Sequence, residues 1–233
     1  MSSQHPMFAP FGAGWPAFRA FLTDLIYPEG AFCRACGRIS GGEILCPACR
    51  GALQNDGLLF RWEAEALEPD LTAYSMTPHT GIARALVLRL KHHGEACVAR
   101  SLGDLLLPLP KDFSFSPDTV VTWVTMPENR RRERMIDHGC LLAEEAARRL
   151  DLPCRQLLIR RETKEKNQAS LNRTARQENL KNAFLPLEKI SFPVLLVDDV
   201  LTTGTTARRC AEALRSGGAE RITVLTYTRA LRT

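Results

Sequence analysis

The sequence predicts an α/β fold in which a parallel β-sheet has helices on both faces and is preceded by a small zinc-binding module. Apolar runs rich in β-branched residues alternate with segments whose apolar residues recur at helical spacing. One such run, residues 194–197, ends in two carboxylates and a hydroxyl-rich turn. Two Cys-x-x-Cys pairs lie close together near the N-terminus. These three observations define the fold class and the order of its parts.

The composition is that of a globular chain with one substantial core. Of 233 residues, 45% are hydrophobic, which suits one main domain with a small appendage. No run of 18 apolar residues is present, so we expect no membrane insertion. Residues 1–31 lack the basic segment and uninterrupted apolar core of a secretory signal. We therefore expect a cytoplasmic protein whose 8 cysteines do not form disulfides.

Residues 1–55 are predicted to form a unit of their own. Apolar side chains at helical spacing predict an amphipathic helix that packs on the zinc module or on the main domain. These side chains are Trp15, Phe18, Leu22 and Leu25. Residues 56–70 mix charges with glycine, and we expect them to link this unit to a main domain, residues 71–233.

The two Cys-x-x-Cys pairs predict a closed metal site. Each turn aims two thiolates at one point, and two such turns complete a tetrahedral set of sulfur ligands for a structural Zn²⁺. The predicted ligands are Cys33, Cys36, Cys46 and Cys49. The other cysteines lack this spacing, and we expect them to be small buried hydrophobic side chains. They are Cys97, Cys140, Cys154 and Cys210.

In the main domain, strands and helices are expected to alternate. The pattern predicts strands at residues 71–76, 119–125, 155–159, 194–197 and 221–227, and helices at residues 80–92, 96–107, 139–150, 170–181 and 207–216. Such alternation is typical of a parallel sheet that binds ligands at the carboxyl ends of its strands.

Residues 194–206 combine groups that suit a ribose phosphate. The turn around Gly204 presents backbone N–H groups and the positive end of a helix dipole to a phosphate. Four hydroxyl donors surround it, on Thr202, Thr203, Thr205 and Thr206. Asp198 and Asp199 can accept hydrogen bonds from a vicinal diol or hold a hydrated divalent cation. A P-loop NTPase is excluded because no Gly-x-x-x-x-Gly-Lys-Ser/Thr occurs, and a receiver domain would carry its acids near its start.

A run of arginines follows the expected strand end at Met126-Pro127. For Arg132 and Arg134 two interpretations stay open. Guanidinium groups match phosphate oxygens in pairs and suit pyrophosphate. A charge run of this kind is otherwise the solvated face of a helix.

Residues 194–206 resemble the phosphoribosyl diphosphate (PRPP) binding motif of type I phosphoribosyltransferases. The resemblance implies that Asp198 and Asp199 hold the ribose hydroxyls, directly or through Mg²⁺, and that residues 202–206 wrap the 5′-phosphate. It also implies a mobile lid in the basic segment at residues 160–166. We place Arg161, Lys164 and Gln168 in this lid. We expect Lys91 to belong to the same group of residues that contact pyrophosphate or form the lid.

The cysteine pairs ahead of this motif make residues 22–230 similar to the competence protein F (ComF) family. Supporting stretches are residues 82–91 with Gly94, and Arg161 with Thr163 and Gln168. One segment departs from the family. Where the family reads Arg-x-Arg-Gly-Phe-Asn-Gln-Ala, residues 132–139 read Arg-Glu-Arg-Met-Ile-Asp-His-Gly.

The resemblance implies a protein that binds PRPP with Mg²⁺ and transfers its phosphoribosyl group to a nitrogen nucleophile through an oxocarbenium-like state. It also implies a role in DNA uptake or in the use of DNA-derived nucleotides. The alternative is a non-catalytic module of the uptake machinery that senses a nucleotide or binds single-stranded DNA beside uptake proteins. A net charge of +5 permits nucleic-acid contact without requiring it. The sequence does not identify the nucleophile.

Overall fold

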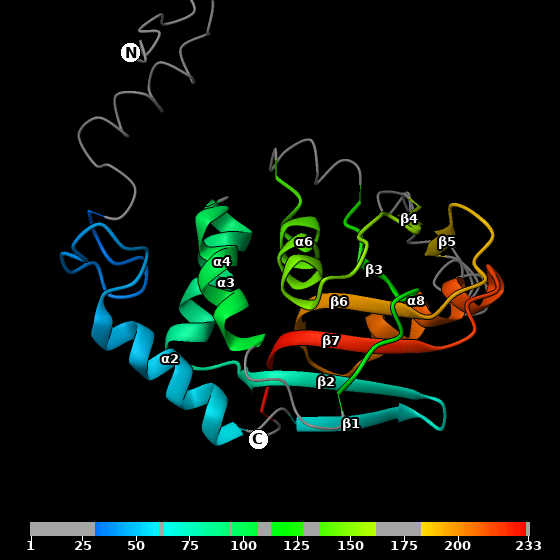
Figure 1. Cartoon of the computed structure of the whole chain (residues 1–233), viewed down its shortest axis with the longest axis horizontal. Helices are drawn as coiled ribbons and strands as arrows, with labels where there is room; N and C mark the ends of the chain where they lie inside the picture. Colours follow the sequence, from blue (N-terminus) through cyan, green and yellow to red (C-terminus); the bar gives the residue numbers. More distant parts are fainter. Residues whose placement is uncertain are drawn as a thin grey trace, which may run out of the picture.

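The computed structural model describes residues 31–60, 63–93, 95–106, 113–127, 136–161 and 183–231. Its main element is a five-stranded sheet of order β1-β2-β7-β6-β3 (Figure 1). The strands are β1 (Glu63–Glu68), β2 (Leu71–Pro78), β3 (Val120–Trp123), β6 (Val194–Leu201) and β7 (Ile222–Arg229). β2, β7, β6 and β3 are parallel, and β1 is an antiparallel edge strand. The carboxyl ends of the four parallel strands therefore lie along one edge.

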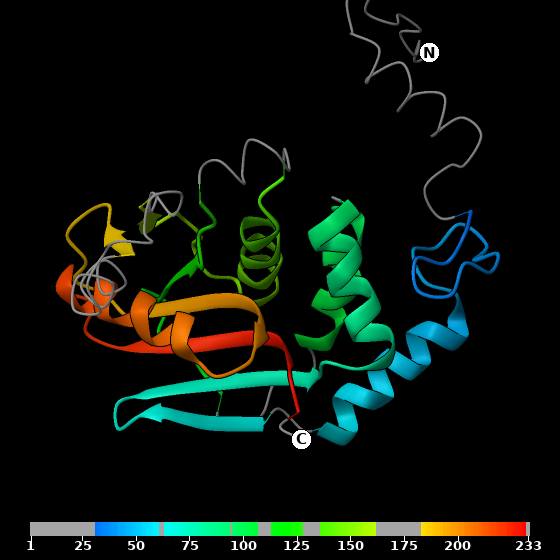
Figure 2. The ribbon, with the colours of Figure 1, turned by 180° about the vertical axis from the view of Figure 1, so that it is seen from behind.

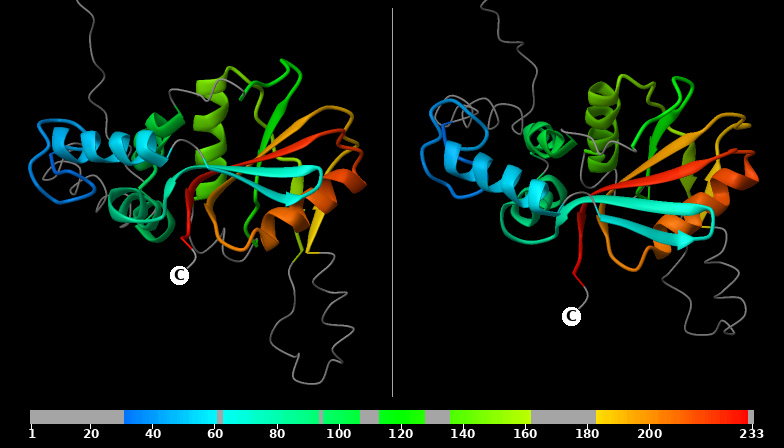
Figure 3. Two further views of the ribbon diagram at one scale, coloured as in Figure 1. Left: turned by 90° about the horizontal axis from the view of Figure 1, so that it is seen from below. Right: turned by 60° about the horizontal axis from the view of Figure 1, so that its bottom comes forward.

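Helices cover both faces of this sheet, which confirms the predicted fold class. One face packs against α3 (Gly81–His93), α4 (Cys97–Gly103) and α6 (His138–Leu150). The other packs against α8 (Thr205–Ser216), and Figure 3 shows α8 on the opposite side of the strands from α6. β6 explains this arrangement, because its first four residues are buried and alternate between the two cores.

A short 3-10 helix (Asp104–Leu106) follows α4 and completes the helical segment expected at residues 96–107. Most other expected elements of the main domain are found within a few residues of their predicted ends. The strand expected at residues 155–159 is different. β4 (Leu158–Arg160) pairs antiparallel with β5 (Phe184–Pro186) in a separate two-stranded sheet that packs on the α8 side.

The segment expected as a linker, residues 56–70, is also different. It holds the end of α2 (Pro47–Phe60) and the whole of β1. β1 pairs with β2, and Leu67 is buried while Glu63 and Glu65 both pair with Arg229 at the end of β7. Alternation of glutamates with small apolar residues suits an edge strand, whose partners lie far away in the sequence.

The cysteine module begins the described chain, and α2 connects it to the sheet (Figures 1 and 2). α2 packs against β2 and α3. Cys33, Leu45 and Leu53 join the same hydrophobic core as α3 and α6. Within the described residues, no helix combines the length and the apolar character needed to cross a bilayer. The helices predicted at residues 15–25 and 170–181 lie outside the described part of the chain.

Candidate functional site

The turn between β6 and α8 leaves the start of α8 open. Gly204 is the N-cap residue, with φ of 73°, and no side chain makes a capping hydrogen bond to this helix. The four hydroxyl side chains around it are exposed, and the Oγ1 atoms of Thr203 and Thr205 lie 2.9 Å apart. Uncapped N–H groups at a helix start, ringed by hydroxyls, are donors of the kind that can bind a phosphate.

A side chain at Gly204 would be strained, because φ is positive and Leu67 lies close by. A Cβ atom at this position would lie 2.7 Å from Cδ2 of Leu67 in β1. Arg208 also joins the turn to β1. Its Nε donates to the Leu67 carbonyl (3.1 Å) and its Nη1 to the Thr203 carbonyl (2.9 Å). The turn is therefore packed closely on the edge strand.

The two carboxylates of the motif lie in different environments. Adjacent residues of a strand point to opposite faces of the sheet. Asp199 is 5% exposed and faces α3 and α6. Lys91 Nζ lies 2.9 Å from its Oδ1, and His138 Nε2 lies 3.2 Å from its Oδ2. Burial acts to raise the pKa of Asp199, but the hydrogen bond from His138 and the charge of Lys91 outweigh it and lower that pKa.

Asp198 is partly exposed, and no cation of the described residues forms an ion pair with it. Its Oδ1 accepts a hydrogen bond from the backbone N–H of Asp199 (2.9 Å). Burial, followed by the negative charge of Asp199, raises the pKa of Asp198 to about 8. Asp198 is thus the motif carboxyl that is free to bind a diol or a cation, while Asp199 already has its partners.

Lys91 lies in the last turn of α3, and the structure brings its ammonium group to Asp199 of the motif. Arg161 is exposed, and its backbone N–H bonds to Ala183 beside the β4–β5 pair. The other residues predicted to contact pyrophosphate or to form the lid lie outside the described part of the chain. They are Arg132, Arg134, Lys164 and Gln168.

His138 is a site residue that we did not predict from the sequence. It stands where the family pattern has Gln, in the segment 132–139 that departs from that pattern. Asp137 beside it caps α6, since its carboxylate accepts from the Cys140 N–H and from Trp123 Nε1, both at 3.2 Å. The departure therefore ties the start of α6 to β3 and β6. The sequence did offer one signal for His138, because it is a polar residue directly after Asp137, a residue type that caps helices.

The four predicted zinc ligands converge. Their sulfur atoms all lie within 4.8 Å of one another, and those of Cys36 and Cys46 are 3.8 Å apart. Tetrahedral Zn²⁺ with Zn–S bonds of about 2.3 Å separates its sulfurs by about 3.8 Å, so the cluster fits this ion. Burial raises the pKa of Cys33, but backbone N–H groups of the module outweigh it and lower the pKa to about 6. Such a thiol is readily available as the thiolate that a metal requires.

The other cysteines differ from one another in burial. Cys210 of α8 is fully buried in the core, as expected of a small hydrophobic residue. Cys97, Cys140 and Cys154 are partly exposed.

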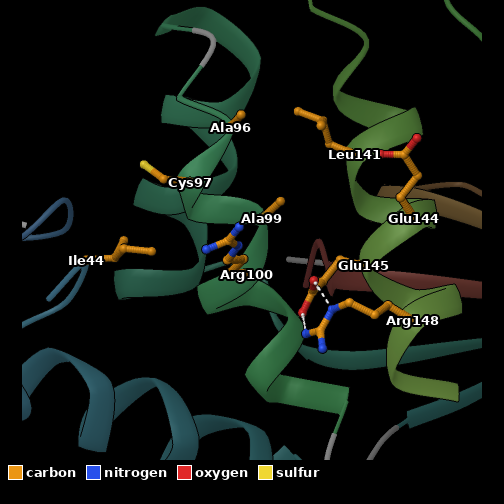
Figure 4. Close-up of a pocket in the computed structure, with 9 residues that line it drawn as sticks. All are labelled: Ile44, Ala96, Cys97, Ala99, Arg100, Leu141, Glu144, Glu145 and Arg148. Atoms are coloured by element: carbon orange, nitrogen blue, oxygen red, sulfur yellow. Dashed lines mark hydrogen bonds and ion pairs between the residues drawn. The ribbon is translucent and has the colours of Figure 1, made fainter. Parts of the chain in front are cut away.

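A groove of about 760 Å³ lies between the cysteine module and the helices α4 and α6 (Figure 4). Ile44 of the module forms one wall, and Arg100 and Leu141 belong to the helices. Glu145 in this groove is already neutralised by Arg148 and Arg149, at 2.7 and 2.8 Å. None of the predicted ribose-phosphate residues lines it, so the groove is separate from the β6–α8 site.

Comparison with known proteins shows a match to one domain family and to two named bacterial proteins. Residues 136–231 match the model of the phosphoribosyl transferase domain family. Competence protein F of Haemophilus influenzae is 32% identical over 62% of this chain and 67% of its own length. DNA utilization protein YhgH of Salmonella typhimurium is 29% identical over 85% of this chain and 90% of its own length. A similar solved structure is the crystal structure of orotate phosphoribosyltransferase from Aeropyrum pernix. The match has 24% sequence identity and a TM-score of 0.35, and it covers 66% of this chain and 67% of the orotate phosphoribosyltransferase chain.

Proposed function

This chain belongs to the competence protein F family, and on that premise we propose that it binds PRPP with Mg²⁺ at the β6–α8 turn and transfers the phosphoribosyl group to a nitrogen nucleophile. The observation that carries the proposal is the uncapped start of α8 with its exposed hydroxyls, in the turn that follows the strand of Asp198. Phosphate and ribose groups of one ligand are matched by neighbouring parts of one turn.

The residues divide the binding between them. The backbone N–H groups after Gly204 and the hydroxyls of Thr202, Thr203, Thr205 and Thr206 take the 5′-phosphate. Asp198 accepts from the ribose hydroxyls. Asp199 keeps Lys91 and His138 in place, so that a positive group and a hydrogen-bonding ring stay next to the sugar site.

The transfer replaces one bond at C1 of the ribose by another. The bond from C1 to the pyrophosphate oxygen breaks, its electron pair leaves with pyrophosphate, and the nucleophile's nitrogen forms the new bond and loses a proton. Positive charge develops on the ring as the leaving group departs. Asp198, the motif carboxyl without an ion-pair partner among the described residues, would stabilise that charge in its ionised form. Bound Mg²⁺ would neutralise the pyrophosphate, and Asp198 is the described oxygen donor available to it.

We further propose that the cysteine module holds one structural Zn²⁺, with no coordination position left for a substrate. The names of the relatives, competence protein F and DNA utilization protein YhgH, support a role in DNA uptake or in the use of DNA-derived nucleotides. If the protein binds PRPP but releases no pyrophosphate when any base is added, it is the non-catalytic nucleotide sensor instead.

Thermal melts with and without PRPP and Mg²⁺ test the proposed ligand. A ligand present at a hundred times its dissociation constant stabilises the native state by about 2.7 kcal/mol. We expect this gain in the wild type, and its loss in Asp198→Asn and in Gly204→Val. Asp118→Asn is the matched control, because Asp118 is an exposed acid before the start of β3. No shift in the wild type, or an equal shift in all variants, would overturn the proposal. A screen of bases for pyrophosphate release then tests the transfer.

A further inference from the structure

A hydrogen-bonded chain crosses three parallel strands at the carboxyl edge of the sheet. His79 follows β2 directly, and its Nδ1 lies 2.8 Å from Oγ1 of Thr228 in β7. The Thr228 hydroxyl donates to the backbone carbonyl of Asp199 in β6, at 3.0 Å. A second bond fixes the position of His79, whose backbone N–H donates to the carbonyl of Arg229 (2.6 Å).

This chain fixes which nitrogen of His79 carries the proton. A backbone carbonyl can only accept, so the single hydroxyl proton of Thr228 is committed to Asp199. Thr228 must then accept from His79, which requires a proton on Nδ1. In the neutral ring, Nε2 is left with a lone pair.

The surroundings keep the ring neutral. Burial lowers the pKa of His79, and the positive charges of Lys91 and Arg84 lower it further, while Asp199 acts in the opposite direction. Among the described residues, Nε2 of His79 has no hydrogen-bond partner. It is not buried either, so a ligand can reach it. His79 therefore presents an unused acceptor at the edge of the site.

The position of this acceptor relates it to the ribose site. The ends of β2 and β6 are separated by β7 alone, so the backbones of these two strands lie roughly 10 Å apart. A ribose with an attached heterocycle spans such a separation. The positive charges of Lys91 and Arg84 act on this position and favour an uncharged or anionic ring over a cationic one.

We infer that His79 Nε2 accepts a hydrogen bond from an N–H group of the nitrogen heterocycle joined to the ribose, and that His79 and Thr228 form the base-recognition subsite. This inference rests on the proposed function, because it places the base next to a ribose bound at the β6–α8 turn.

Binding of nucleotides to the full chain tests the subsite separately from the ribose-phosphate site. Ribose 5-phosphate is compared by calorimetry with AMP, GMP, IMP, CMP and UMP. We expect at least one nucleotide to bind roughly tenfold more tightly than ribose 5-phosphate, a ratio that corresponds to about 1.4 kcal/mol. In His79→Asn, whose amide can still donate to Thr228, that preference is expected to disappear while the affinity for ribose 5-phosphate is unchanged.

Two further variants sharpen the result. His79→Gln carries a carbonyl oxygen near the place of Nε2 and is expected to restore part of the preference. His92→Asn is the matched control, since His92 is exposed near the end of α3, and it should behave as wild type. The subsite is overturned if no nucleotide binds more tightly than ribose 5-phosphate, if His79→Asn keeps the preference, or if it loses ribose 5-phosphate as well. Failure of the wild type to bind ribose 5-phosphate or PRPP would overturn the proposed function and the subsite together.

Discussion

The cysteine module and the carboxyl edge of the sheet both gather ligating side chains, but by different means. In the module, four sulfurs from one short stretch converge because two tight turns aim them at one point. At the sheet edge, Asp199 meets Lys91 from α3 and His138 from α6, which are remote in sequence. The first cluster is a local property of the chain, and the second exists only when the sheet and both helices have formed. The first should therefore depend on its metal, and the second on the whole fold.

Of the changes to these two regions, loss of zinc from the cysteine module is expected to have the largest effect on stability. In Cys33→Ser combined with Cys46→Ser, two of four ligands are gone, and apparent binding energies of about 10–16 kcal/mol in zinc-finger peptides set the scale of the loss. We expect one Zn²⁺ per chain in the wild type and none in the variant, with faster hydrogen exchange concentrated in residues 31–60. Metal analysis and exchange mass spectrometry measure both. Cys97→Ser is the control, and unchanged zinc in the double variant would refute the site.

Removal of the Asp199 charge is expected to have the next largest effect. Asp199→Asn leaves Lys91 and His138 without their carboxylate, and breaking a buried pair costs about 3 kcal/mol, at the low end because Lys91 is partly exposed. Urea unfolding at pH 7 measures the loss. Since the pKa of Asp199 is lowered, its stabilising contribution is present above the ordinary value of 3.8 and fades as the pH falls through the lowered pKa. Asp118→Asn should change stability little, and an equal loss in both variants would contradict the pairing.

A smaller effect is expected at the β6–α8 turn. Gly204→Ala places a Cβ at positive φ and against Leu67, which we expect to cost about 2 kcal/mol. Adding Leu67→Ala should relieve the contact but not the backbone strain, so the double variant should show less than the summed loss of the two single variants. Gly51→Ala in α2, where nothing lies within 4 Å of the added carbon, is the control. Additive losses would show that Gly204 and Leu67 do not touch.

An effect of the opposite sign is expected at Asp198. Because its folded pKa is raised to about 8, the proton that it holds stabilises the native state at low pH, and this stability is lost as the pH rises from 3.8 through 8. Asp198→Asn should therefore be more stable than wild type near pH 9, and this gain should shrink as the pH falls to 5. Melting temperatures at pH 5, 7 and 9 test this. A gain that does not depend on pH would mean that the charge is not its cause.

The sequence by itself determined the parts whose signals are local. The spacing of Cys33, Cys36, Cys46 and Cys49 predicted a convergence that the structure shows. The apolar run before Asp198 and the helical spacing after Gly204 predicted β6 and α8, because burial on two faces and an amphipathic face leave marks within one segment. The same local patterns predicted the α/β fold class.

Only the tertiary structure decided which side chains meet. The pairing of β1 with β2 was missed, and residues 56–70 were interpreted as a linker, because the partners of an edge strand leave little trace in its own sequence. The adjacent Asp198 and Asp199 look alike in the sequence, yet strand alternation sends them to opposite faces, where one meets Lys91 and His138 and the other keeps a free carboxyl. The chain from His79 through Thr228 to Asp199 likewise depends on strand order, since it requires β7 to lie between β2 and β6.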